Sequence, residues 1–513
     1  MRSKPQHGRS VVSLLAGLFF LSSCSFGTAE VGIPASLPPT TAAGTTSTST
    51  TPVADGSSTT TTEAPEEPVG PVEIQISPAD DASTIIQDAP AGSTFVFAPG
   101  VHRRFSVRPK DGTSFIGTQG AILSGAVLLS DAVPTEDGWR FDGLEFTGDD
   151  HGTCIDGYDG CGLSQDLFID DVMMWQVTDR DDLVAGTWYW QADSIYVADD
   201  PTNRRTEVSV DDFAFVGDND DVTIRDLVIE KYSTPAQSGA VQSQNPGNGD
   251  RGSGWVIEDI EVRGAHGAGI RTGDNTIVRR SYSHHNGQMG ISVSGGTDVL
   301  LEDNEFAFNN TAGFRWGWEA GGGKFTRTHG LIVRGNYSHD NIGPGLWTDI
   351  DAVDTLYELN LVERNTGPGI FHEISYAATI RNNTVIGNGT DSSGWLWGAG
   401  IVVAASPEVE VFGNEVRGNA NGIAGIQQER GSGDFGPHLL SSLYVHDNII
   451  ELGDGGIGIV EDVGDSAVFT DYDNRFNRNI YEGPVGRAYR WDGNQLDRAG
   501  WVGAGQDVDG IWR

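Results

Sequence analysis

Most of this chain consists of one short repeat, and the repeat limits the folds that the chain can adopt. Apolar triplets lead to successive anchor positions, whose shortest spacings are 21, 23, 24 and 23 residues. The anchors are Leu227, Ile260, Ser281, Asn304, Asn336, Asn360, Asn383, Asn414 and Asn448. Five residues later another Asn follows, at Asn286, Asn309, Asn341, Asn365, Asn388 and Asn419. Nine residues after the anchor comes Gly with an apolar residue, at Gly269-Ile270, Gly290-Ile291, Gly313-Phe314, Gly345-Leu346 and Gly369-Ile370.

The repeat predicts a parallel β-helix. Its apolar residues alternate or form short runs, which is typical of β-strands and not of helices. A unit of this length cannot bury its own apolar face, whereas stacked units share a continuous core. The Asn residues are then expected in columns, each amide bonding to the next rung, as structural elements. Leucine-rich repeats have a similar period, but their L-x-x-L-x-L signature is absent.

Several segments resemble one family. Asn382-Asn-Thr-Val-Ile-Gly-Asn388 and Gly345-Leu-Trp-Thr-Asp349 resemble the bacterial right-handed parallel β-helix proteins of the pectate-lyase-like superfamily. Residues 89–92, 98–100 and 116–117 are similar to its first rungs, and residues 501–507 to its terminal segments. The resemblance implies an all-β fold, a single-stranded right-handed parallel β-helix (a solenoid), over residues 73–513. It leaves the activity open, because the superfamily contains lyases, epimerases, hydrolases and binding proteins.

Residues 165–210 interrupt the repeat. Short strand signals occur there at residues 166–171, 186–190 and 195–198. They predict a small β-hairpin side subdomain beside the solenoid. Trp188, Tyr189 and Trp190 could contact a ligand, although packing is the favoured role.

The first residues predict export. Arg2, Lys4 and Arg9 precede a short apolar core, so residues 1–23 are interpreted as a signal peptide. Leu21-Ser-Ser-Cys24 resembles a bacterial lipoprotein lipobox, which implies cleavage before Cys24 and lipidation of its thiol; an ordinary secretory signal is the alternative. Residues 24–72, rich in Thr, Ser and Pro, are expected to form a disordered tether. The expected location is the extracytoplasmic face of the bacterial cell membrane, with the lipid as the membrane anchor.

The charge limits the partners. With 32 basic and 72 acidic residues the formal net charge is −40, which disfavours nonspecific nucleic-acid binding and adsorption to anionic membranes. No stretch of 18 or more apolar residues occurs, so no transmembrane helix is expected. Besides Cys24 the chain has only Cys154 and Cys161, which an oxidising compartment is expected to join as a disulfide. Zinc requires more ligands than this pair supplies. The solenoid is expected to be a monomer.

Strand alternation places two columns of side chains on one outward face. The first column is expected to contain Arg271, Ser292, Arg315, Trp347, Phe371 and Val402, and the second Gly273, Ser294, Gly317, Asp349, Glu373 and Ala404. Asp349 and Glu373 then stack about 4.8 Å apart. Two such carboxylates bind a cation, pair with a basic side chain or share a proton. Three interpretations stay open: a Ca²⁺ site bridging a substrate uronate, an acid and nucleophile pair of a retaining hydrolase, or a solvated acidic ladder.

Two insertions flank that face. One contains Trp318, Glu319 and Lys324, and the other Trp395 and Trp397. These insertions are predicted to wall a groove. Lys324 is the candidate base, with a solvated loop lysine as the alternative.

The preferred hypothesis is a polysaccharide lyase or epimerase acting on an acidic, uronic-acid glycan. Its expected catalytic residues are Lys324, Arg315, Asp349, Glu373 and Glu319. Its expected substrate-binding residues are Arg271, Trp318, Trp347, Phe371, Trp395 and Trp397. Because the protein is strongly acidic, a polyanionic substrate requires Ca²⁺ or the arginines. The alternatives are a glycoside hydrolase that uses Asp349 and Glu373, and a noncatalytic surface protein that binds a cell-envelope glycan.

Overall fold

The computed structural model describes residues 70–146, 150–391, 394–483 and 486–513, all within one compact unit, Glu66–Arg513. The predicted signal peptide, Cys24 and the tether up to residue 69 lie outside the described residues. No helix in the described ranges is long and apolar enough to cross a membrane.

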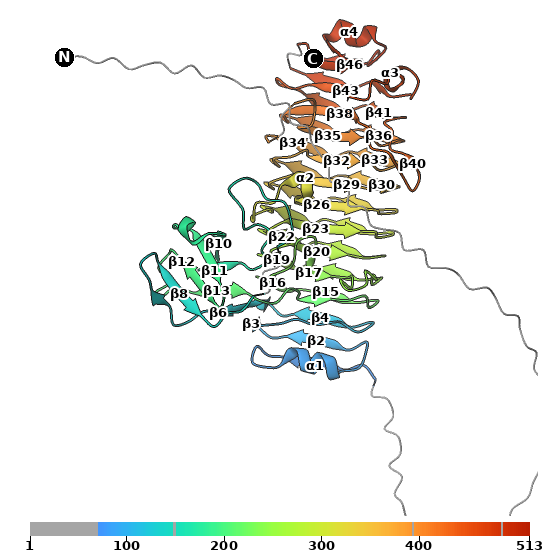
Figure 1. Ribbon diagram of the computed structural model, residues 1–513. Coiled ribbons are helices and arrows are strands. Elements are labelled where there is room, and N and C mark those ends of the chain that lie inside the picture. Colours follow the sequence, from blue (N-terminus) through green and yellow to red (C-terminus); the bar gives the residue numbers. More distant parts are fainter. Residues whose placement is uncertain (1–69, 147–149, 392–393, 484–485) are drawn as a thin grey trace, which may run out of the picture. The chain divides into compact units, whose positions relative to one another are not determined.

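Three long sheets form the solenoid (Figure 1). The first sheet contains, in spatial order, β1 (Glu73–Ile76), β2 (Thr94–Phe97), β4 (Ser114–Gly117), β15 (Thr223–Arg225), β18 (Val256–Glu258), β21 (Ile277–Arg279), β24 (Leu300–Glu302), β27 (Ile332–Arg334), β30 (Thr355–Glu358), β33 (Ala378–Arg381), β36 (Val409–Phe412), β41 (Tyr444–His446) and β44 (Arg475–Asn477). The second contains β3 (Gly100–Arg103), β5 (Ala121–Ser124), β16 (Val228–Glu230), β19 (Glu261–Arg263), β22 (Tyr282–His284), β25 (Glu305–Ala307), β28 (Tyr337–His339), β31 (Leu361–Glu363), β34 (Thr384–Ile386), β37 (Glu415–Arg417), β42 (Ile449–Glu451), β45 (Ile480–Glu482) and β48 (Ile511–Trp512). The third contains β14 (Phe215–Val216), β17 (Gly239–Gln242), β20 (Ala268–Thr272), β23 (Met289–Ser294), β26 (Gly321–Thr326), β29 (Leu346–Asp349), β32 (Ile370–Glu373), β35 (Ala399–Ala404), β38 (Asn421–Gln427), β43 (Ile457–Glu461), β46 (Tyr489–Trp491) and β47 (Asn494–Leu496).

Each rung supplies one strand to each sheet, and neighbouring rungs pair in parallel. In the first sheet, Leu300 of β24 pairs with Ile332 of β27, which pairs with Leu356 of β30. The strands of one sheet are therefore far apart in sequence but adjacent in space, as Figure 1 shows. This arrangement confirms the predicted right-handed parallel β-helix. Helix α1 (Ala82–Asp88) precedes β2, α3 (Ala467–Thr470) lies between β43 and β44, and α4 (Arg498–Gly503) lies between β47 and β48.

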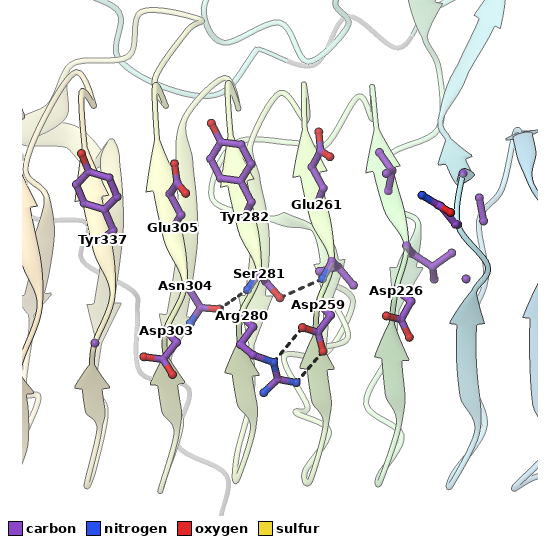
Figure 2. A pocket seen from close by; sticks show the side chains of 18 residues that line it. Asp226, Asp259, Glu261, Arg280, Ser281, Tyr282, Asp303, Asn304, Glu305 and Tyr337 are labelled. Carbon is purple, nitrogen blue, oxygen red and sulfur yellow. Dashed lines mark hydrogen bonds and ion pairs between the residues drawn. The ribbon is translucent and has the colours of Figure 1, made fainter.

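Asn side chains form two continuous ladders inside the solenoid. In the anchor ladder, Asn360 donates from its Nδ2 to Asn383 Oδ1 at 2.9 Å and accepts from the backbone nitrogen of Asn336 at 2.9 Å. The same pattern begins where the backbone nitrogen of Ser281 donates to Asn304 Oδ1 at 3.1 Å, a bond drawn in Figure 2. The predicted Asn columns are confirmed, and they satisfy backbone groups at the buried turns.

The repeat glycines make room for the second Asn ladder. A Cβ atom on Gly269 would lie 2.9 Å from Asn286 Nδ2 and 3.0 Å from the carbonyl oxygen of Gly290. The same two neighbours, a ladder amide and the next rung's carbonyl, crowd Gly290, Gly322, Gly345 and Gly369. A side chain at these positions would displace a ladder amide, so the glycine is sterically required.

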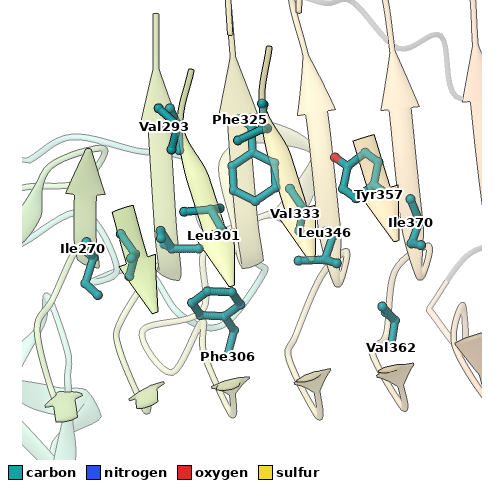
Figure 3. Close-up of a cluster of buried hydrophobic side chains, with 14 of the residues drawn as sticks. Ile270, Val293, Leu301, Phe306, Phe325, Val333, Leu346, Tyr357, Val362 and Ile370 are labelled. Atoms are coloured by element: carbon teal, nitrogen blue, oxygen red, sulfur yellow. The ribbon is translucent and has the colours of Figure 1, made fainter. Parts of the chain in front are cut away.

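The core is one continuous cluster between the three sheets. Phe306 of the second sheet, Leu301 and Val333 of the first, and Phe325 and Leu346 of the third are all fully buried in it. Figure 3 shows these side chains pointing into the interior from different strands. Each central strand residue faces inward while its neighbours face outward, as the alternation predicts.

The side subdomain is larger than expected. Its sheet contains, in spatial order, β6 (Ala126–Leu128), β13 (Thr206–Ser209), β9 (Leu167–Ile169), β10 (Val172–Gln176), β11 (Thr187–Gln191), β12 (Ser194–Val197), β8 (Trp139–Asp142) and β7 (Val133–Pro134), with a short helix η1 (Arg180–Asp182). It therefore starts near residue 126, before the predicted 165–210 boundary, because strand signals at 126–142 complete the sheet. Trp188 is fully buried in its core. Cys154 and Cys161 form a disulfide in the loop that connects β8 and β9.

Candidate functional site

The outward face of the third sheet carries a column that differs from the predicted one at a single position. Strand pairing aligns Arg271 with Ser292, Ser292 with Lys324, Lys324 with Trp347 and Trp347 with Phe371. Lys324 therefore lies in strand β26 and not in a loop. It occupies the place that the repeat assigned to Arg315.

The misplacement has a physical cause. Gly313 has the expected offset, but its φ is +82° and a Cβ there would meet Tyr158 of the disulfide loop. Gly322 instead lies beside the Asn ladder, 2.9 Å from Asn341 Nδ2 by the same measure. The residues between them form the short helix α2 (Trp316–Glu319). The insertion thus precedes the strand, where the sequence suggested that it followed.

Arg315 and Trp318 lie away from the column. The Arg315 guanidinium donates to the Cys154 carbonyl oxygen at 2.8 Å and forms an ion pair with Asp156 at 2.5 Å. The Trp318 ring stacks on Phe314 with centroids 5.7 Å apart and contacts His151 edge-on at 5.2 Å. Both residues therefore hold the disulfide loop against helix α2. The structure gives Arg315 no contact with Lys324, Asp349 or Glu373.

Lys324 is a buried cation held by two carboxylates and a ring. Its Nζ atom lies 2.9 Å from Asp349 Oδ2, 3.1 Å from Glu319 Oε1 and 3.8 Å from the ring centroid of Trp347. Burial lowers the pKa of Lys324, but the charges of Asp349 and Glu319 outweigh burial, and the pKa is raised. An ammonium with a raised pKa keeps its proton, so these surroundings argue against the predicted role of Lys324 as a base.

Asp349 and Glu373 end neighbouring strands of the third sheet. The residues before them, Thr348 and His372, are a register pair, fully buried and hydrogen-bonded to each other at 2.6 Å. The two carboxylates therefore project from the opposite, outward face, on strands whose backbones are about 4.8 Å apart. They are only 6% and 7% exposed, so their charges interact through little solvent.

Their surroundings differ. Asp349 is paired with the Lys324 ammonium, whereas Glu373 is paired with Arg430. Burial raises the pKa of Glu373, the neighbouring Asp349 charge raises it further, and Arg430 and Lys324 oppose this only in part. Glu373 therefore retains its proton to a higher pH than an ordinary glutamate, which suits a proton donor.

Arg430 is a member of the site that the repeat could not predict. It comes from the segment between β38 and β39 (Ser432–Gly433), 57 residues after Glu373. His438 fixes this segment, because its Nε2 lies 3.0 Å from Asp351 Oδ1 and its Nδ1 3.2 Å from the Arg430 carbonyl oxygen. The segment leads into the hairpin of β39 and β40 (Gly436–Pro437), and it contacts Glu373 through Arg430. Because this segment lies outside the repeat, no periodic pattern in the sequence predicts that Arg430 reaches Glu373.

Aromatic side chains adjoin the carboxylates. Trp347 stacks on Phe371 with centroids 5.3 Å apart, and Trp316 and Trp397 contact this pair edge-on at 6.5 and 5.9 Å. The indole nitrogen of Trp347 is buried without a hydrogen-bond partner. Trp395 is 42% exposed and lies outside this aromatic cluster. The structure thus brings Trp347, Phe371 and Trp397 of the predicted substrate-binding residues together.

Arg271 lies two rungs from Lys324, about 9.6 Å along the column. Its Nε donates to Gln244 Oε1 at 2.8 Å, its Nη1 donates to the Gln237 carbonyl oxygen, and burial lowers its pKa. In the described part of the chain no carboxylate lies within ion-pair distance of it. Arg271 is therefore an oriented, unpaired guanidinium at the edge of the site.

The carboxylates do not fit a calcium site. Ca²⁺ requires 6–8 oxygen ligands, whereas Asp349 and Glu373 already have cationic side chains as partners. Among residues 70–513, leaving out the gaps named above, no group of three His, Cys, Asp or Glu side chains could hold a metal ion. The predicted calcium bridge therefore lacks a ligand set here.

Comparison with known proteins places the fold. Residues 247–403 match the family model described as the right handed beta helix region, a range that includes Lys324, Asp349 and Glu373. Among solved structures, the complex of XylC with xylose is similar with a TM-score of 0.59 and 16% identity, over 84% of this chain and 82% of that chain. The chain is accordingly a right-handed parallel β-helix protein. The comparison with curated proteins gives no match.

Two other solved structures are similar at a lower level. A mannuronic acid specific polysaccharide family 6 lyase from human gut microbiota has 10% identity and a TM-score of 0.47, over 85% of this chain and 84% of that chain. The A-module of the Azotobacter vinelandii mannuronan C-5 epimerase AlgE6 has 14% identity and a TM-score of 0.43, over 84% and 93%. Because both TM-scores are below 0.5, the function has to be argued from the site.

Proposed function

We propose that this protein is a retaining glycoside hydrolase in which Asp349 is the nucleophile and Glu373 the general acid and base. One observation carries the proposal: the two carboxylates lie on neighbouring rungs but differ in their electrostatics. The Lys324 ammonium pairs with Asp349, whereas the pKa of Glu373 is raised. The strands that carry them lie about 4.8 Å apart, a spacing compatible with the ~5–5.5 Å carboxyl separation of retaining enzymes and shorter than the ~6.5–9.5 Å of inverting ones.

The reaction has two steps. In the first, Asp349 attacks the anomeric carbon while Glu373 donates its proton to the glycosidic oxygen, so that the C–O bond breaks and the alcohol leaves. In the second, the Glu373 carboxylate takes a proton from water, whose oxygen attacks the anomeric carbon and releases Asp349. The anomeric configuration is inverted twice and therefore retained.

Lys324 positions the nucleophile in this proposal. Its contacts with Asp349 and Glu319 hold the Asp349 carboxylate toward Trp347 and stabilise its negative charge. Because Nζ lies between two carboxylates, removing its proton would leave two uncompensated buried charges. This is the main argument against β-elimination with Lys324 as the base.

The substrate is proposed to be a neutral glycoside. With Glu373 protonated, the charges of Asp349 and Glu319 balance those of Lys324 and Arg430, so the site has no net positive charge to attract a polyanion. Trp397, which is half-buried, supplies apolar surface for a sugar ring, whereas Trp347 is buried against Lys324 and Phe371. The structural relative solved with xylose makes xylosides the first substrates to try.

A lyase or epimerase remains the second candidate because of one observation. Arg271 is an unpaired guanidinium two rungs from Lys324, and such a group suits a uronate. Elimination from a uronate creates a double bond that absorbs in the ultraviolet, whereas hydrolysis does not. Absorbance with polyuronates, unchanged in Glu373→Gln, would favour this candidate.

The proposed location is the outer face of the membrane, with Cys24 lipidated and residues 24–72 as a tether. Its support is the sequence alone: a basic segment, an apolar core and Leu21-Ser-Ser-Cys24. Mass spectrometry of the purified protein would show an N-terminal acylated cysteine.

A panel of nitrophenyl glycosides that includes xylosides tests the activity. We expect release of nitrophenol from at least one neutral glycoside by the wild-type protein, and a loss of more than about 10³-fold in Asp349→Asn. Asp447→Asn is the matched control, because Asp447 pairs with His446 and Arg478 between β41 and β42, away from the carboxylate pair. Activity that survives in Asp349→Asn would refute the assignment.

A further inference from the structure

A polar groove lies at the corner between the first and second sheets, whereas the carboxylate pair lies on the third sheet. It has a volume of about 860 Å³ and crosses the rungs from Gly117 to Tyr337. Figure 2 shows its floor: Glu261, Tyr282, Glu305 and Tyr337 come from successive strands of the second sheet, with Asp226, Asp259 and Asp303 in a row at the turns. None of these residues belongs to the site described above.

The groove contains the same three-residue arrangement twice. Tyr282 stacks on His284 with centroids 3.8 Å apart, and His284 Nε2 lies 3.2 Å from Glu261 of the preceding rung. Two rungs on, Tyr337 stacks on His339 at 3.9 Å, and His339 Nε2 lies 3.1 Å from Glu305. Strand register places Tyr282, Glu305 and Tyr337 in one line.

A histidine covers one face of each tyrosine ring. Among the described residues no second ring or cation stacks on either tyrosine, and Figure 2 shows both tyrosine rings face-on in the lining of the groove. The two rings lie about 9.6 Å apart, twice the rung spacing. Regularly spaced aromatic rings, each supported by a stacked histidine, can bind the flat, partly apolar units of a repeating polymer. Sugar rings are such units.

The charge of the groove selects against an acidic ligand. Its lining has five carboxylates, Asp226, Asp259, Glu261, Asp303 and Glu305, and one guanidinium, Arg280. Arg280 is already paired with Asp259 at 2.7 Å. Carboxylates accept hydrogen bonds from hydroxyl groups but repel anions.

We infer that this groove binds a neutral polysaccharide, with alternate sugar units stacked on Tyr282 and Tyr337. The carboxylates at the rim accept hydrogen bonds from hydroxyl groups of the sugar. Because the groove runs across the rungs, the bound polysaccharide would lie parallel to the long axis of the solenoid. This inference goes beyond the proposed hydrolase and does not depend on it, because binding at the corner involves no bond cleavage.

A third tyrosine supplies a matched control. Tyr444 stacks on His446 at 4.0 Å, and His446 contacts Glu410 at 2.9 Å, so the arrangement is the same. It belongs to the first sheet, outside the groove, and the Arg475 guanidinium lies 4.2 Å from its ring centroid. Its ring is therefore already occupied.

Affinity electrophoresis in native gels containing soluble xylan, mannan, mixed-linkage glucan or polygalacturonate tests the inference. Full-length Glu373→Gln is used as the background, so that turnover does not remove the ligand. We expect at least one neutral polysaccharide to retard it, and polygalacturonate to leave it unretarded. Tyr282→Ala and Tyr337→Ala should each weaken retardation about tenfold and together abolish it, while Tyr444→Ala should bind normally.

Unfolding temperatures and the conservative variants separate binding from folding. Tyr282→Phe and Tyr337→Phe keep the ring and should keep most of the retardation. The inference is overturned if no neutral polysaccharide retards the protein, or if retardation survives in a folded Tyr282→Ala, Tyr337→Ala double variant. Absence of hydrolysis would refute the proposed hydrolase and leave this gel result unaffected.

Discussion

Lys324 is the residue on which the charge balance of the carboxylate site depends. It is 5% exposed and pairs with both Asp349 and Glu319. Breaking a buried pair leaves the partner charge uncompensated. The consequence should be visible in stability as well as in turnover.

We predict that Lys324→Met lowers the free energy of unfolding by about 3–5 kcal/mol and removes most of the glycosidase activity. Urea unfolding and initial rates measure the two effects. Lys110→Met is the control, since Lys110 is a half-buried lysine whose ammonium donates to two backbone carbonyl oxygens. A Lys324→Met variant with wild-type stability would contradict the buried ion pairs.

Arg430 opposes the rise in the pKa of Glu373, the proposed proton donor. Its charge opposes the burial and the Asp349 charge that raise the pKa of Glu373. We predict that Arg430→Gln raises this pKa further, so that the protonated form persists and the alkaline limb of kcat/KM moves to higher pH. Arg417→Gln, which breaks ion pairs with Glu415 and Glu482 on the second sheet, should leave the limb unchanged. A shift of the limb to lower pH in Arg430→Gln would exclude Glu373 as the acid.

At the scale of the element, each rung between Asn304 and Gly400 is held by one glycine and two asparagines. The glycine leaves space for a ladder amide and for the carbonyl of the next rung. A rung is therefore specified by few residues, and errors in them should affect the whole stack.

We predict that Gly269→Ala destabilises the protein by about 1–3 kcal/mol, because its Cβ would lie 2.2 Å from Ser283 Oγ and 2.9 Å from Asn286 Nδ2. Gly503→Ala, where a Cβ meets nothing within 4 Å, should be neutral or slightly stabilising. Thermal unfolding of both variants makes the comparison. Equal unfolding temperatures would show that the Asn ladder can shift to accommodate the added methyl group without a loss of stability.

The rungs could be predicted from the sequence because their pattern is local and recurs. Alternation within a strand also placed Trp347, Phe371, Asp349 and Glu373 on one face. The register failed at Lys324, because Gly313 has the expected offset from Asn304, whereas the glycine that lies beside the ladder amide of Asn341 is Gly322.

Other parts of the site were not predictable. Arg430 and His438 reach the site from a segment outside the repeat, through contacts across 57 and 87 residues. The first strands of the side sheet were missed because they precede the disulfide loop and join the later strands only through antiparallel pairing, such as β12 with β8. Long-range pairings of this kind leave no periodic signal in the sequence.

At the scale of the whole molecule, the strong negative charge would require calcium only for a polyanionic substrate, and the proposed substrate is neutral. The formal net charge is −40, and Asp349 and Glu373 have Lys324 and Arg430 as partners. We predict that EDTA changes neither the unfolding temperature nor the turnover of a neutral glycoside. Added calcium should have no effect either. Loss of activity in EDTA that calcium restores would mean that a metal completes the site.

Chemical rescue of the carboxylate variants with azide tests the central claim most directly. Azide needs no general base, so in Glu373→Ala it should attack the glycosyl ester on Asp349 and give a glycosyl azide of retained configuration. In Asp349→Ala azide replaces the nucleophile and should give the inverted azide. The measurement is the anomeric coupling constant of each product by NMR. The account predicts retention for Glu373→Ala and inversion for Asp349→Ala; the opposite pair, or no rescue in either variant, would contradict it.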